Sequence, residues 1–212
     1  MKKQRYQYIL WVILLVSACT NPFSTRDPEE PSGTASTEIY EPALEPYIVI
    51  KNFSRSIEQK NITKYMENFQ DETVDPTHIF RFIPEKYYLE EFTRSWTLMD
   101  EYDYFNALIH SGTNDFPHIK FEFADSALTL SPINVSASDD SLVSNNFKYR
   151  LVVEYPDHTD EYSATMILRL AKSKISPEYW HIYYWRDYAI ENNYDQTWTY
   201  LKLKSISGKG AN

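Results

Sequence analysis

Glycine is scarce in this chain of 212 residues. Its four glycines are Gly33, Gly112, Gly208 and Gly210, and they form no glycine-rich loop. Phosphate-binding loops need clustered glycines, because only a backbone without Cβ atoms approaches a phosphate closely. The sequence therefore excludes a P-loop and a dinucleotide-binding fingerprint. It also contains no G-x-S-x-G elbow and no H-E-x-x-H helix, which excludes two common hydrolase signatures.

Cysteine is nearly absent, with Cys19 as its one occurrence. A domain without a second thiol forms no internal disulfide, so its stability must come from an apolar core. Hydrophobic residues make up 42% of the chain and aromatic residues 16%. That content is sufficient for the core of one domain of this size.

Basic residues are also under-represented, with 21 Lys and Arg against 30 Asp and Glu and a formal net charge of −9. A surface of this sign repels the phosphate backbone, so the sequence predicts no nucleic-acid partner.

Histidines occur singly along the chain, as His78, His110, His118, His158 and His181. Zinc sites draw their ligands at short, regular spacings, which these histidines lack. Asp157, Asp160 and Glu161 surround His158, but their spacing matches no EF-hand loop. We interpret that segment as a solvated acidic turn, and we predict no metal ion, no cofactor and no catalytic residue.

The N-terminus has the three-part layout of a secretory signal. A basic segment at residues 2–5 and an apolar run at residues 8–16 are followed by two small residues and then Cys19. The apolar run is far shorter than the ~20 residues of a membrane-spanning helix. Residues 1–18 are therefore predicted to be a removed signal peptide.

Residues 16–19 (VSAC) resemble the lipobox of bacterial lipoproteins. The resemblance implies that Cys19 becomes the lipid-bearing N-terminus and that its acyl chains, palmitate among them, anchor the protein in the cell envelope. Each buried methylene contributes ~0.8 kcal/mol, and several chains are needed for stable anchoring. Thr20 in place of an aspartate favours the outer membrane, by resemblance to enterobacterial sorting. An ordinary signal peptide that ends in a cysteine is the alternative.

One tether and one domain follow the predicted signal. Residues 19–45 are rich in Pro, Ser, Thr and Glu without an apolar period, which predicts a flexible tether. Residues 46–204 form the predicted domain, and residues 205–212 are predicted to be a disordered tail.

Apolar residues at helical spacing predict three helices in the first half of the domain. The first begins at Pro46, and its buried stripe is Ile50, Phe53 and Ile57. The second spans residues 62–69. The third follows the capping-box-like pair Thr97 and Asp100, and its predicted buried stripe is Leu98, Tyr102, Phe105 and Ile109. A short strand is predicted at residues 78–83.

Alternation of apolar and polar residues predicts four antiparallel strands in the second half. They are residues 119–123, 147–155, 162–170 and 179–188, with a hairpin loop at 156–160. A short closing segment carries Trp198 and Leu201.

The order of these elements resembles the NTF2-like superfamily, also called SnoaL-like or cystatin-like α+β. The amphipathic segment IVIKNFSRSIEQKNITKYMENF and the ending YWHIYYWRDY…TWTYLK carry the resemblance. It implies an α+β cone, in which three helices of the N-terminal half pack on a curved, mainly antiparallel sheet and the open end holds a small molecule. Function does not follow from this fold.

Four residues of the last strand are candidates for a ligand pocket, because they alternate along one face: His181, Tyr183, Trp185 and Asp187. A His–Asp pair in an apolar pocket has shifted pKa values and suits acid–base chemistry. A half-buried sheet face or a homodimer surface also explains these residues, since Tyr and Trp are enriched at interfaces. We favour the second interpretation.

We therefore expect a membrane-anchored envelope lipoprotein whose non-catalytic NTF2-like module binds a small ligand or an envelope protein. One alternative is a SnoaL-like, metal-independent enzyme that works in the cone; another is a surface module that binds glycans through some of its 18 Tyr and five Trp. An open cavity with a buried His or Asp favours the enzyme. An interior filled by Tyr and Phe favours the binding or structural module, and a flat exposed row of Tyr or Trp favours glycan binding.

Overall fold

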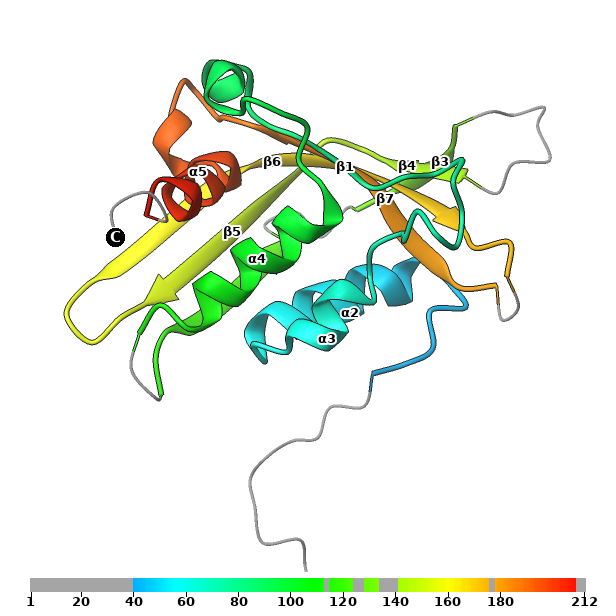
Figure 1. Cartoon of the computed structure of the whole chain (residues 1–212), viewed down its shortest axis with the longest axis horizontal. Coiled ribbons are helices and arrows are strands. Elements are labelled where there is room, and N and C mark those ends of the chain that lie inside the picture. The colour runs from blue at the N-terminus through cyan, green and yellow to red at the C-terminus, as the bar shows by residue number, and fades with distance from the viewer. Residues whose placement is uncertain (1–39, 113–114, 124–127, 134–140, 176–177, 209–212) are drawn as a thin grey trace, which may run out of the picture. The chain divides into compact units, whose positions relative to one another are not determined.

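The computed structural model describes residues 40–112, 115–123, 128–133, 141–175 and 178–208 (Figure 1). The predicted signal peptide, Cys19 and most of the predicted tether lie outside these residues. Within the described ranges, no helix has both the length and the hydropathy that crossing a bilayer requires.

The helix α2 (Pro46–Glu58) confirms the predicted start at Pro46. Proline suits the first turn of a helix because the N–H that it lacks has no intrahelical partner there. The predicted stripe of Ile50, Phe53 and Ile57 is buried, and Val49 is buried with it. This face of α2 packs against the sheet.

The next helix, α3 (Ile62–Met66), is capped by the side chain of Asn61 and is shorter than the helix predicted over residues 62–69. The reason is the backbone that follows it. Residues 68–70 bond to the backbone of Ile182 through two hydrogen bonds of 2.8 and 2.9 Å. This pairing draws the chain to the edge of the sheet and ends the helix.

The helix α4 (Leu98–Ile109) confirms the third predicted helix and its capping box. The carboxylate of Asp100 accepts from the backbone N–H of Thr97 at 2.8 Å, and the Thr97 side chain accepts from the N–H of Asp100. The predicted stripe is wrong at Tyr102, which is 40% exposed. The buried residues are Glu101, Tyr104, Phe105 and Leu108. The helix is turned so that Glu101 faces the interior, where it has a charged partner.

Four long strands confirm the period-two predictions: β2 (His118–Phe123), β5 (Phe147–Glu154), β6 (Thr159–Lys172) and β7 (Trp180–Tyr188). They pair antiparallel in the order β2, β5, β6, β7. The strand β4 (Ser141–Ser144) pairs with the far end of β6 and with β3 (Leu130–Pro132). The sheet is therefore mainly antiparallel, as predicted.

The strand β1 (Arg81–Ile83) makes the sheet mixed, because it pairs parallel with β7. It is shorter than the strand predicted over residues 78–83. The side chain of Asp75 accepts from the backbone N–H of Thr77 at 2.9 Å, which holds the preceding segment in a turn. Only the last residues of the predicted strand are free to pair with β7.

Both boundaries of the predicted domain are extended in the structure. The closing segment forms a helix, α5 (Trp198–Gly208), which includes residues 205–208 of the predicted tail. At the other end, Ala43 belongs to the predicted tether but accepts a hydrogen bond of 2.8 Å from the backbone N–H of Trp180. Short 3-10 helices, η1 (Lys86–Glu91) and η2 (Tyr194–Gln196), precede α4 and α5.

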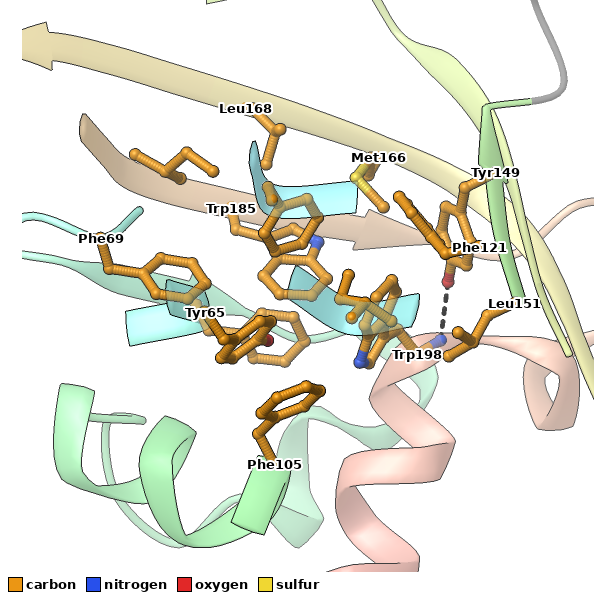
Figure 2. Close-up of a cluster of buried hydrophobic side chains, with 14 of the residues drawn as sticks. Tyr65, Phe69, Phe105, Phe121, Tyr149, Leu151, Met166, Leu168, Trp185 and Trp198 are labelled. Atoms are coloured by element: carbon orange, nitrogen blue, oxygen red, sulfur yellow. Dashed lines mark hydrogen bonds between the residues drawn. The ribbon is translucent and has the colours of Figure 1, made fainter. Parts of the chain in front are cut away.

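The helices α2, α3 and α4 lie on one side of the sheet, and the core fills the space between them (Figure 1). Aromatic rings dominate this core (Figure 2). The ring of Phe53 lies 5.7 to 6.1 Å from five others, which belong to Tyr65, Phe69, Phe121, Trp185 and Trp198. Such ring pairs add to the stabilisation from burial. The inside of the predicted cone is therefore occupied by the protein's own side chains.

Candidate functional site

A lysine and a glutamate form an ion pair inside the apolar core. Lys202 on α5 and Glu101 on α4 are both fully buried, and the Lys202 ammonium donates to both oxygens of the carboxylate. Tyr65 and Trp96 donate to the same carboxylate at 2.6 and 2.7 Å. An isolated buried charge is very costly, and these partners offset that cost.

Aromatic rings surround the ammonium group of Lys202. The ring centroids lie 4.4 to 5.0 Å from Nζ and belong to Phe82, Trp96, Tyr104 and Trp185. The faces of such rings attract a cation. Burial nevertheless lowers the pKa of Lys202 to about 8, with Glu101 acting in the opposite direction.

A second buried carboxylate, Asp187 near the end of β7, lies at the first turn of α5. Tyr149 donates to Oδ1 at 2.8 Å, and the backbone N–H and hydroxyl of Thr199 both donate to Oδ2 at 2.7 Å. The first N–H groups of a helix lack intrahelical partners, so a carboxylate there is favourable. Burial raises the pKa of Asp187 to about 6, although the hydrogen bonds from Thr199 and Tyr149 and the charge of Lys202 lower it.

The hydroxyl of Tyr149 links the sheet to α5, because it also accepts from the backbone N–H of Trp198 at 2.7 Å (Figure 2). The indole N–H of Trp198 in turn donates to the hydroxyl of Tyr104 on α4 at 2.7 Å. We call these buried, hydrogen-bonded residues the interior network: Glu101, Lys202, Asp187, Tyr149, Trp198 and Tyr104. Glu101, Lys202 and Asp187 are each at most 1% exposed, so a substrate reaches them only if the core opens.

The described surface carries a groove between α3, the first half of α4 and the start of β7, which we call the α3–α4 groove. Its volume is about 880 Å³, within the range of ligand pockets. Apolar side chains form much of its wall, among them Ala43, Ile62, Met66, Phe69, Val74 and Leu98. A second hollow of about 940 Å³ extends along β1 and shares four residues with the groove, Gln70, Asp71, Leu98 and Met99.

Three residues of the α3–α4 groove carry a buried polar atom that has no hydrogen-bond partner among the described residues. The atoms are Oδ1 of Asn52, Oε1 of Gln70 and Nδ1 of His181. A buried polar atom without a partner costs about 1–3 kcal/mol and calls for an explanation. A bound molecule that supplies the missing hydrogen bonds is one explanation.

A carboxylate, a hydroxyl and an imidazole also meet before β1, but their geometry does not suit a proton relay. Nδ1 of His78 lies 2.9 Å from Oδ2 of Asp75 and 3.2 Å from the hydroxyl of Thr77. A catalytic triad uses one imidazole nitrogen for the carboxylate and the other for the nucleophile. Both contacts here involve the same nitrogen, which indicates a turn-stabilising role. The turn's bonds hold the pKa of Asp75 at about 2, against the effect of burial.

The structure separates the four residues that the sequence places on one face of the last strand. The register between β6 and β7 shifts at Arg169 and Leu170, so Tyr183 is the extra residue of a β-bulge in β7 and the alternation reverses there. Trp185 and Asp187 face the interior with Ile182, so His181 does not share their face and the His–Asp pair of the less favoured interpretation does not form. This part of the prediction is wrong because a bulge has no clear signal in the sequence.

His181 and Tyr183 have different surroundings. His181 lines the α3–α4 groove, and burial lowers its pKa while the Tyr179 backbone opposes the shift. The lowered pKa favours the neutral form of the ring. Tyr183 packs edge-on against His78, with ring centroids 4.7 Å apart.

Sequence reasoning did not single out Asn52, Gln70, Glu101 or Lys202. Asn52 lies between apolar residues on the buried side of α2, and Lys202 lies between two leucines. A polar residue inside an apolar stripe is the signal that points to both. The groove itself joins segments distant in sequence, for which no spacing rule exists.

The surface tyrosines that contact one another, Tyr87, Tyr88 and Tyr194, do not form a flat row. Tyr87 stacks on Tyr194 with centroids 4.3 Å apart, but it stands at 89° to Tyr88. The described tryptophans, Trp96, Trp180, Trp185 and Trp198, are all buried. These residues therefore lack the platform that glycan binding predicts.

In the part of the chain that the structure describes, no group of three or more His, Asp, Glu or Cys side chains could hold a metal ion.

Comparison with known proteins identifies the fold. No protein-family model matches the sequence, and no curated protein matches it. The β subunit of benzoate 1,2-dioxygenase from Burkholderia mallei aligns with 69% of this chain and 89% of its own, with a TM-score of 0.50 and 10% identity.

Two NTF2-like proteins also align with the chain. One, of unknown function in nutrient uptake, from Rhodospirillum rubrum, covers 69% of this chain and 98% of its own, with a TM-score of 0.48 and 9% identity. An NTF2-like superfamily protein from Salmonella enterica covers 68% and 88%, with a TM-score of 0.47 and 15% identity. The chain has an NTF2-like α+β fold, as predicted, with a mixed, seven-stranded sheet.

Proposed function

We propose that this chain is an envelope lipoprotein whose NTF2-like domain is a non-catalytic binding module, with the α3–α4 groove as its ligand site. One observation carries the proposal. The ionisable groups of the interior network are buried and bonded to one another, whereas three polar atoms without partners belong to residues that line the groove. An acid–base catalyst must come within hydrogen-bond reach of its substrate, and Asp187 and Lys202 are closed off.

The groove has the composition of a ligand site. Such sites are mostly apolar, with a few polar groups that orient the ligand. Met66 lies half-buried in the groove wall, so Met66→Trp would fill the space that a ligand uses. We expect the full-length protein in nanodiscs to bind benzyl alcohol and the Met66→Trp variant to lose that binding. Saturation-transfer NMR measures the binding. Equal binding by both proteins would contradict the assignment of the groove.

The anchor is proposed from the sequence around Cys19. A lipid on this cysteine would hold the domain at the envelope, with the outer membrane favoured. Metabolic labelling with palmitate should mark the wild-type protein and leave Cys19→Ser unlabelled, and globomycin should block removal of residues 1–18. A wild-type protein that takes up no label would refute the anchor without affecting the groove.

A homodimer through the outer face of the sheet remains a prediction. Arg169 lies 4.6 Å from the ring centroid of Tyr184 on that face, and Arg186 lies 4.8 Å from that of Tyr188. Arg and Tyr are enriched at interfaces, which supports the prediction. Sedimentation of the wild type and of a Tyr184→Glu variant tests it, because a charge in the interface should yield monomers.

A further inference from the structure

Two amide oxygens in the wall of the α3–α4 groove indicate the chemical class of its ligand. We propose that the ligand is an organic cation, with an ammonium or guanidinium group on an apolar body, and this rests on the binding function proposed above. The cationic group donates hydrogen bonds to the side-chain oxygens of Asn52 and Gln70.

The amide nitrogens of both residues already donate hydrogen bonds within the protein, so the side-chain oxygens are the atoms that remain for a ligand. Nδ2 of Asn52 donates to the backbone oxygen of Glu41 at 2.8 Å, and Nε2 of Gln70 donates to that of Asp71 at 3.1 Å. The groove therefore offers acceptors from these amides. A ligand that complements them must bring N–H or O–H donors, and an anion without donors leaves both oxygens unsatisfied.

The charges around the groove favour a cationic donor over a neutral one. Three carboxylates line it; Glu41 pairs with Lys51 and Glu67 with Lys64, which leaves Asp71 as the carboxylate without an ion pair among the described residues. The whole chain carries a formal net charge of −9. Hydrogen bonds from a charged donor are about twice as strong as those between neutral groups. A cation therefore gains from both the acceptors and the surrounding field.

Aromatic and thioether side chains suit the apolar body of such a ligand. Tyr102 and Tyr179 line the groove, and ring faces attract cations. Met66 and Met99 lie beside them, and Met99 is 67% exposed. Methionine adapts its shape to a bound group. These residues exclude water from the part of the ligand that carries no charge.

The amide side chains must move slightly for this recognition. The unpartnered oxygens of Asn52 and Gln70 each expose less than 1 Å². Changes of side-chain rotamer on binding are common. We expect both amides to turn toward the groove when a donor enters.

Three probes that share a phenyl ring test the head group. Benzylamine is a cation with donors, benzyl alcohol is a neutral donor, and benzoate is an anion without a donor at neutral pH. Affinities are measured by saturation-transfer NMR on the full-length protein in nanodiscs, with empty nanodiscs subtracted. We expect benzylamine to bind most tightly, about tenfold or more above benzoate, with benzyl alcohol between them.

A pair of matched variants tests the acceptor. Gln70→Met keeps a similar side-chain volume and removes the oxygen together with the Nε2 donor, which bonds to Asp71 and not to the ligand. Benzylamine should therefore bind about tenfold more weakly. Gln196→Met makes the same change at an exposed position outside the groove and should bind as the wild type does.

The outcomes separate this inference from the proposed function. If benzylamine and benzoate bind equally tightly and Met66→Trp binds neither, the proposal of a cationic ligand is wrong, but the groove remains a binding site. Unchanged benzylamine affinity in Gln70→Met would overturn the role of the amide. If no probe binds more than it does to empty nanodiscs, both the cationic ligand and the groove as a ligand site are wrong.

Discussion

The interior network and the α3–α4 groove both contain buried polar groups, but they satisfy them differently. In the network, the Glu101 carboxylate has the Lys202 ammonium, Tyr65 and Trp96 as donors, and Asp187 has three hydrogen bonds. In the groove, three residues have an atom with no described partner. Trp185 Nε1, inside the core, is the exception to this division.

This difference indicates which polar groups stabilise the fold and which are available to a ligand. A satisfied network makes the arrangement of α4, α5 and β7 unique, because each removed partner leaves a charge or a donor buried. A buried polar group without a hydrogen-bond partner lowers stability, and proteins retain such groups at functional sites, such as ligand-binding sites. Mutations should therefore reduce stability strongly in the network and weakly in the groove.

The largest effect is expected from breaking the buried ion pair. Glu101→Leu leaves the Lys202 ammonium in the core without a counter-charge, and the free energy of unfolding should fall by about 3–5 kcal/mol. Urea denaturation measures the change. The double variant Glu101→Leu/Lys202→Met removes both charges and should recover part of the loss. A double variant less stable than the single one would contradict the pairing.

A change of up to roughly 3 kcal/mol is expected from the titration of Asp187. Burial raises its folded pKa from 3.8 to about 6, so the folded chain holds this proton more tightly than the unfolded chain. The stability contributed by the proton is full below about pH 4 and is lost as the pH rises through 6.

The variant Asp187→Asn cannot titrate at this position. The difference in unfolding free energy between wild type and variant, measured from pH 4 to pH 7, isolates the effect. A difference that does not change with pH would refute the raised pKa.

A smaller loss, about 1–3 kcal/mol, is expected for Tyr149→Phe. The change leaves Oδ1 of Asp187 and the backbone N–H of Trp198 without the Tyr149 hydroxyl. Thermal unfolding measures the loss. Tyr184→Phe is the control, because its ring lies on the outer face beneath Arg169 and should retain wild-type stability within about 0.5 kcal/mol.

Regular elements were predictable from the sequence where their pattern was clean. The strands β5 and β6 alternate over most of their length, and α4 carries its capping residues at the expected spacing. The helix α5 was missed because its buried positions include Thr199 and Lys202, which pattern reasoning assigns to the surface. Partners distant in sequence make those positions stable inside the core.

The candidate site was less predictable than the fold. His181 was selected from an alternating strand, and it does line a groove. Its neighbours there, Asn52 and Gln70, come from α2 and from the segment after α3, and no local rule joins these three positions. The bulge at Tyr183 also moved Trp185 and Asp187 to the interior, which a strict period of two does not anticipate.

The most direct test of the division between network and groove is the free energy of unfolding of Gln70→Met, measured beside its affinity for benzylamine. The variant removes a buried acceptor that has no described partner, which favours folding, and it also removes the hydrogen bond from Nε2 to the Asp71 backbone oxygen, which opposes folding. The free energy of unfolding should therefore fall by no more than about 1 kcal/mol. Affinity should fall about tenfold. A larger loss of stability with unchanged affinity would contradict the account, because Gln70 would then hold the fold and not the ligand.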